Sequence, residues 1–182
     1  MKIDEEIVAL RDLPPKKKWS VYRKIMKSGS SSTIDFLKTV MEKFAMSSNK
    51  TDIKIAYDFY KRTGYKFTFI GYLLGTNENI PSSIMDDLVS LNDIVIKVAV
   101  SKNVAITDSV IKKLLETRNR IIMTHLLNNP SYTVERFNKF FNYYLDAASG
   151  PSCESFIKEI ISYAKKHKLP TVELLFRSKL GA

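Results

Sequence analysis

The chain has one cysteine, two histidines and one tryptophan among its 182 residues. A single cysteine cannot form an internal disulfide, and one cysteine with two histidines is a poor ligand set for a structural zinc site. No apolar run is long enough to span a bilayer, and the first ten residues contain three carboxylates where a secretory leader would be basic and then apolar. We therefore expect a cytoplasmic, soluble protein without a metal, a cofactor or a membrane partner.

Glycine and proline are also scarce, with six residues of each, and they punctuate the chain at intervals instead of forming linkers. Hydrophobic residues make up 45% of the sequence and charged residues 26%, which is a globular composition. No internal domain boundary is visible in the sequence. We expect one domain over residues 1–182, with basic helices over 1–50, repeats over 52–145 and further helices over 146–182.

The positive charge is concentrated near the ends. The net charge is +10, yet residues 51–80 and 81–130 each contribute only +1. The short segment 11–27 alone has a net charge of +6. A second, smaller cluster near the other end consists of Lys165, Lys166, His167 and Lys168. A polyanion or an acidic protein surface would be attracted to both ends, although lysine-rich helix faces also occur simply because they are well solvated.

Apolar residues recur at steps of three and four along most of the chain, which predicts amphipathic helices. The expected helices cover residues 15–28, 33–46, 52–63, 65–74, 81–91, 94–102, 108–117, 120–127, 134–148 and 151–168. Alternation of apolar residues over 66–70 would also fit a strand. We favour a helix there because of the repeat that follows.

Placing the chain over itself with an offset of 26 residues aligns apolar positions in several columns. Each unit pairs two short helices and closes on Asn77, Asn103 or Asn129. Such short pairs cannot bury their apolar faces alone, so they must stack on neighbours. The sequence predicts an all-α, right-handed αα-solenoid with longer capping helices at both ends. The residues expected in its core are Leu88, Val95, Leu114, Ile121, Leu126 and Phe140.

The units over 80–103 and 105–129 resemble short HEAT-like repeats of the bacterial variant leucine-rich kind. In that family a helix, an acidic or asparagine-containing corner and a second helix ending in asparagine recur. The resemblance covers about residues 52–145. It implies a curved superhelix that binds a partner, with the partner differing from member to member.

The segment PPKKKWSVYRKIMKSG interleaves cations with Trp19 and Tyr22. Cations neutralise phosphates and aromatic faces can stack on unpaired bases, which indicates nucleic-acid binding. On a helix, however, the aromatic residues share one face and the lysines another, so we place the aromatics in the core. The candidate binding residues are Lys16, Lys17, Lys18, Arg23, Lys24, Lys27, Lys165, Lys166 and Lys168.

The segment RNRIIMTH resembles the Arg-polar-x-His signature of HEPN ribonucleases, which are four-helix proteins that usually act as dimers. By that resemblance Arg118 or Arg120 would bind the scissile phosphate, Asn119 would position the arginine and His125 would assist proton transfer. The repeat explains the same residues without catalysis, because 118–120 form a corner between two helices.

We therefore predict a non-enzymatic binding protein. The first hypothesis for its partner is nucleic acid or a nucleoprotein assembly bound through the basic N-terminal helix. The alternative is a specific protein bound by the repeat surface, with the protein acting as an adaptor or inhibitor. A HEPN-like ribonuclease is the third hypothesis, and no Gly-rich phosphate loop or nucleophile elbow supports another enzyme class.

Overall fold

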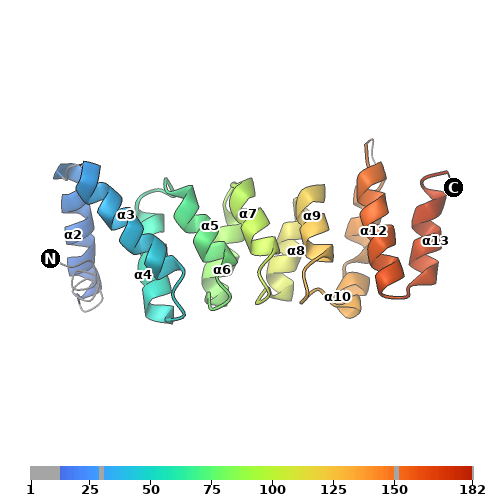
Figure 1. Cartoon of the computed structure of the whole chain (residues 1–182), viewed down its shortest axis with the longest axis horizontal. Coiled ribbons are helices and arrows are strands. Elements are labelled where there is room, and N and C mark those ends of the chain that lie inside the picture. Colours follow the sequence, from blue (N-terminus) through green and yellow to red (C-terminus); the bar gives the residue numbers. More distant parts are fainter. Residues whose placement is uncertain (1–12, 29–30, 150–151, 182) are drawn as a thin grey trace. The chain divides into compact units, whose positions relative to one another are not determined.

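The computed structural model describes residues 13–28, 31–149 and 152–181, and in this part of the chain helices are joined by turns, with no strand. Its helices are α2 (Pro15–Ser28), α3 (Ser31–Ala45), α4 (Lys50–Arg62), α5 (Thr68–Thr76), α6 (Ser82–Ser90), α7 (Ile94–Ser101), α8 (Asp108–Glu116), α9 (Arg120–Leu127), α10 (Val134–Lys139), α11 (Phe141–Ala147), α12 (Glu154–Lys166) and α13 (Pro170–Ser178) (Figure 1). The all-α prediction is confirmed. The chain divides into two compact units, unit 1 up to Ile84 and unit 2 from Met85 onward.

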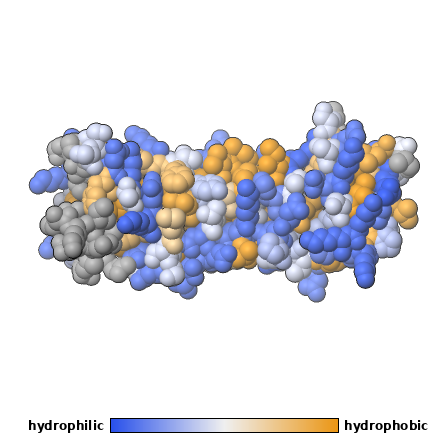
Figure 2. Space-filling view, in the orientation of Figure 1, coloured by the Kyte–Doolittle hydropathy of each residue, from blue (hydrophilic) through white to orange (hydrophobic). Residues whose placement is uncertain are grey.

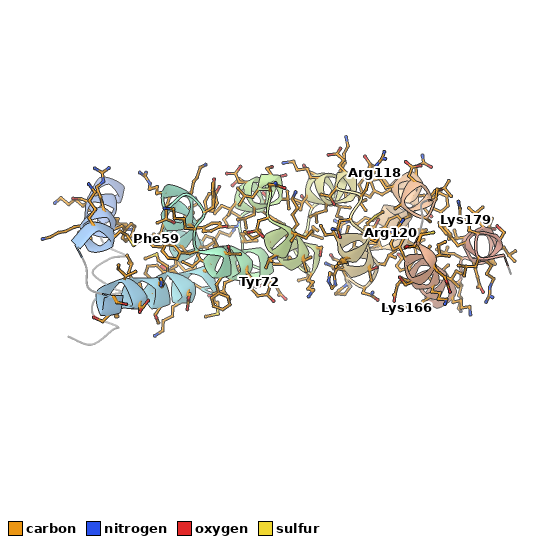
Figure 3. All side chains as sticks on the ribbon, turned by 90° about the horizontal axis from the view of Figure 1, so that it is seen from above. Phe59, Tyr72, Arg118, Arg120, Lys166 and Lys179 are labelled. Carbon is orange, nitrogen blue, oxygen red and sulfur yellow. The ribbon has the colours of Figure 1, made fainter. Side chains whose placement is uncertain are left out.

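In unit 1, α3 packs against α4 and α5, and α2 packs against α3. The interior is strongly aromatic, because Phe59 and Tyr60 are fully buried and Phe59 stacks on Phe67 at a centroid distance of 5.5 Å. Figure 3 labels Phe59 in this unit, together with Tyr72 of α5. Asn77 follows α5, and its side-chain amide donates to the carbonyl oxygens of Ala45 and Ser47 at 2.7 and 2.8 Å. These bonds connect the end of α5 to the end of α3 and the turn that follows it.

In unit 2, α9 packs against α7, α8 and α12, and α12 packs against α13. Ion pairs connect alternate helices along the chain. Lys113 of α8 pairs with Asp86 of α6 at 3.0 Å, and Asp108 of α8 pairs with both Arg136 and Lys139 of α10 at 2.9 and 2.6 Å. The buried core residues of this unit include Leu88, Leu114, Ile122, Leu126, Phe137, Tyr144, Ile160 and Phe176.

Asparagine and aspartate side chains fix helix starts and turns of unit 2. Asp93 accepts hydrogen bonds from the Val95 and Ile96 amides, and Asn119 does the same one helix pair later. These side chains satisfy backbone N–H groups that have no partner within a helix's first turn. The buried Asn129 donates to the carbonyl oxygens of Ser101 and Asn103 at 3.0 and 2.9 Å. These bonds connect the turn after α9 to the end of α7 and the turn after it.

Two of the six predicted core residues are not buried. Leu88, Leu114, Leu126 and Phe140 lie in the core as predicted. Val95 and Ile121 are 47% and 61% exposed, so the prediction was wrong for both. Each is the second residue of its helix, and the next residue along, Ile96 or Ile122, points inward in its place.

Several predicted helix limits also differ from the structure. The expected single helix 134–148 is two helices, because Phe140 leaves helical geometry at φ −110° and ψ 15° and turns its ring into the core. Asn49, and not Asp52, caps α4, while Asp52 is buried in the first turn and accepts a hydrogen bond from Ser47. Helix α5 starts at Thr68 instead of residue 65, and α13 was not predicted.

Candidate nucleic-acid interface

Helix α2 presents one apolar face and one basic face. Its 14 residues contain no carboxylate. Tyr22 is 3% exposed and meets Phe59 edge-on at 5.5 Å, which fixes the apolar face against the interior of unit 1. The predicted binding residues with exposed side chains are Lys17, Arg23, Lys24 and Lys27. The separation of faces predicted from the sequence is confirmed for Tyr22, whereas the side chains of Lys16 and Trp19 lie outside the described residues.

A groove of about 230 Å³ lies between α2 and α4. Three cations and one carboxylate line it, from Lys18 on α2 and from Lys54, Asp58 and Arg62 on α4. Lys54 and Arg62 were not predicted from the sequence. Their spacing of eight residues, with Asp58 midway, places all three on one helix face, which the sequence could have shown, whereas their place beside α2 depends on tertiary packing.

The Tyr22 ring also lines this groove. Its hydroxyl is buried and has no hydrogen-bond partner among the described residues. Burial first, and the nearby Asp58 carboxylate second, raise the pKa of Tyr22 far above that of a free phenol. The ring is therefore neutral at physiological pH and provides apolar packing beneath the charged groups.

The C-terminal cations lie in unit 2. Lys165 and Lys166 are exposed in the last turn of α12, and Lys168 is exposed in the turn that follows, at a φ of 56°. Figure 3 labels Lys166 among the helices at this end of the chain. His167 packs on the Tyr163 ring at 4.3 Å. Cations at a helix C-terminus are stabilised by the helix dipole, so these lysines have a structural explanation beside a binding one.

The residues of the ribonuclease-like motif lie around two hollows beside α9. Arg120 and Ile121 line both hollows. The first, of about 290 Å³, also includes His125 and Glu159, and the second, of about 460 Å³, includes Arg118. Arg118 and Arg120 are labelled in Figure 3. The structure therefore brings the predicted residues into one neighbourhood.

Two of the motif's polar groups have structural partners. Arg120 donates from Nε to the Ala147 carbonyl oxygen at 3.1 Å and from Nη1 to the Ser152 carbonyl oxygen at 2.9 Å, which ties α9 to the end of α11 and the start of α12. Asn119 is occupied by capping α9. Partial burial, followed by the Lys102 charge, lowers the pKa of His125, so the imidazole is neutral at pH 7.

Cys153 is half-buried at the start of α12, where its thiol lies 3.4 Å from the Ala148 carbonyl oxygen. Within the described ranges, no three His, Cys, Asp or Glu side chains gather closely enough to hold a metal ion. In the same part of the chain, no helix combines the length and apolar character that crossing a bilayer requires.

No protein-family model, curated protein or solved structure matches this chain.

Proposed function

We propose that this chain is a non-enzymatic binding protein that docks on nucleic acid or a nucleoprotein assembly through α2. The observation that supports the proposal most directly is a helix without carboxylates on which Lys17, Arg23, Lys24 and Lys27 are exposed while Tyr22 is buried. Such a face neutralises phosphates without rearrangement of the fold.

The groove between α2 and α4 would extend this surface. Lys54 and Arg62 add two cations from a second helix to those of α2. Tyr22 is buried, so it is not free to stack on bases. We expect contacts to the phosphate backbone, which depend weakly on base sequence and strongly on salt.

We also propose that the helices form a right-handed solenoid with a repeat of 26 residues. In support, α6, α8 and α10 begin at intervals of 26 residues, as do α5, α7 and α9. The capping side chains follow the same interval, with Asp93 and Asn119 in one pair and Thr107 and Thr133 in the other.

Gel-shift titrations at two salt concentrations, with single- and double-stranded probes, test the binding proposal. We expect the Lys17/Lys24/Lys27→Gln variant to bind more weakly. The slope of the logarithm of the binding constant against the logarithm of the salt concentration should become less negative by roughly 0.7–0.9 for each phosphate that is no longer neutralised. The matched control is Lys112/Lys158/Lys179→Gln, which removes the same charge from exposed positions in unit 2. Failure of the wild type to bind any probe at low salt would overturn the proposal, and equal weakening by both variants would exclude α2 as the site.

A second candidate function is that of an adaptor or inhibitor that binds a specific protein. It is favoured by Phe69, Val95 and Ile121, which occupy equivalent positions 26 residues apart and are 57%, 47% and 61% exposed. A repeated position that places large apolar side chains in solvent is typical of an interaction surface.

We assign no catalytic role to Arg118, Arg120 or His125. Arg120 and His125 do border one hollow, which a HEPN-like ribonuclease would need. The Arg120 guanidinium, however, is bound to two backbone carbonyls. We expect an RNA probe to stay intact during incubation, and cleavage that disappears in His125→Ala would instead establish the ribonuclease.

A further inference from the structure

The face formed by α7 and α9 in unit 2 exposes apolar side chains where two neighbouring helices begin. Ile94 and Val95 start α7, and Ile121 lies at the start of α9; they are 47%, 47% and 61% exposed. Helices α7 and α9 pack directly on each other, and Figure 2 shows hydrophobic surface over both. These three side chains therefore define one apolar patch, which we name the α7–α9 patch.

The charges around the α7–α9 patch are mainly positive. Residues 92–102 and 118–128 contain Lys97, Lys102, Arg118 and Arg120, and one carboxylate, Asp93, which accepts from the Val95 and Ile96 amides as the cap of α7. Lys102 lies close enough to His125 to lower the pKa of its imidazole, so the positive charge extends to the last turn of α9. Two further carboxylates, Asp146 and Glu159, line the hollows on the α11 and α12 side.

We infer that the α7–α9 patch binds an acidic amphipathic helix of a partner protein. Neighbouring packed helices lie about 8–10 Å apart. Positions i and i+7 of a helix are separated by about 10.5 Å along its axis, so one apolar stripe can contact Val95 and Ile121 together. The partner's carboxylates would face Lys97 and Lys102, away from Asp146 and Glu159.

The hollows beside Ile121 favour a protein partner over a flat membrane surface. Their volumes, about 290 and 460 Å³, accept side chains that project from a helix, and Phe156 gives the smaller one an apolar wall. This inference concerns unit 2 and is independent of nucleic-acid binding by α2.

Fluorescence anisotropy with a designed probe tests the inference. The probe is a labelled peptide of about 20 residues with leucines at i, i+3, i+7 and i+10 and glutamates on the flanks. We expect Val95→Asp and Ile121→Asp to weaken its binding at least about tenfold. The matched control is Leu174→Asp, because Leu174 of α13 is 67% exposed and lies outside the patch. A peptide with lysines in place of the glutamates should bind far more weakly.

Aspartate is compatible with the fold at both positions, since each is the second residue of a helix and a negative charge there complements the helix dipole. Circular dichroism checks each variant, and Lys97→Glu provides a second, electrostatic test, because it reverses a charge that would face the partner's carboxylates and should weaken binding of the acidic peptide. The inference is wrong if the acidic peptide does not bind, if the lysine peptide binds equally well, or if Leu174→Asp weakens binding as much as Ile121→Asp. It is also wrong if anionic vesicles bind through Ile121 and the peptide does not.

Discussion

At the residue scale, side chains of the same type in similar helices can differ widely in burial. Leu114 and Leu174 are both leucines within short helices, yet Leu114 is fully buried and Leu174 is 67% exposed. The cost of truncating a side chain depends on the packing that is removed and on the cavity that remains, so the same substitution should have very different effects.

We expect Leu114→Ala to lower the free energy of unfolding by about 2–5 kcal/mol. Leu174→Ala, the matched control, should change it by less than about 0.5 kcal/mol. Thermal or urea unfolding of the two variants measures both values. Similar destabilisation by the two substitutions would contradict the assigned core.

Asn129 provides a second comparison, with its neighbour Asn128 as the control. The buried Asn129 side chain donates to two carbonyl oxygens from an earlier turn and accepts from the Ser131 amide; the two donated bonds are buried and the accepted one is partly buried. Asn128 is exposed, and its side chain donates to the Thr124 carbonyl oxygen of its own helix. Asn129→Leu should cost at least about 1–3 kcal/mol, since buried polar groups lose their partners, whereas Asn128→Leu should cost much less. Urea unfolding measures both, and equal costs would show that the Asn129 bonds contribute little.

The Asp108 carboxylate makes stability depend on pH. The hydrogen bond from Lys139, followed by the charges of Lys139 and Arg136, holds its pKa below the usual value despite slight burial. A lowered folded-state pKa contributes stability above the unfolded-state pKa of about 3.9, and this is lost as the pH falls through the folded-state value. We expect Asp108→Asn to unfold less steeply with acid below about pH 4 than wild type. Asp146→Asn is the control, and identical acid profiles for wild type and Asp108→Asn would refute the linkage.

At the element scale, the helices could be predicted from the sequence much better than the faces they bury. Capping residues identified the starts of α7 and α9, because Asp93 and Asn119 bond locally to the next amides. The run Ile94, Val95 and Ile96 is apolar at every position, so periodicity alone could not show which residue points inward. Tertiary packing selects Ile96, with Ala99 and Val100, as the buried face.

Only part of the candidate nucleic-acid interface could be predicted from the sequence, because the rest depends on tertiary packing. Lysines crowded along α2 are visible in the sequence, whereas the contribution of Lys54 and Arg62 depends on α4 packing beside α2.

The break between α10 and α11 was also hidden from the sequence. No glycine or proline marks it. Phe137, Phe140 and Tyr144 are all buried, and their steps of three and four fit one continuous helix equally well. The apolar pattern therefore could not reveal that the backbone leaves helical geometry at Phe140.

The caps of α7 and α9 should each be worth about 0.5–2 kcal/mol, so Asp93→Ala and Asn119→Ala should each destabilise the protein by that amount. Both side chains accept two amide hydrogen bonds at a helix start. Asn138→Ala, at an exposed position inside α10, is the control. Urea titrations measure all three, and a loss in the control as large as in the cap variants would contradict this interpretation.

At the scale of the whole molecule, the two units have separate aromatic interiors. In unit 1, Phe59 packs with Tyr22 and Phe67. In unit 2, Phe137 packs with Tyr144 and Tyr163. Local networks of this kind allow parts of a chain to open with different free energies, as in repeat proteins whose stability comes from nearest-neighbour contacts.

Hydrogen exchange should therefore report the site of a core truncation. Phe59→Ala removes a fully buried ring from unit 1, which should cost about 3–5 kcal/mol and accelerate amide exchange in α3, α4 and α5 by roughly 100-fold or more. Exchange in α9 and α12 should change much less, because their core residues keep their packing. Phe137→Ala is the reciprocal variant, for which α9 and α12 should accelerate and α3 and α4 should not. If either substitution accelerated all of these helices equally, the chain would unfold as one cooperative block, and the energetic independence of the two units would be disproved.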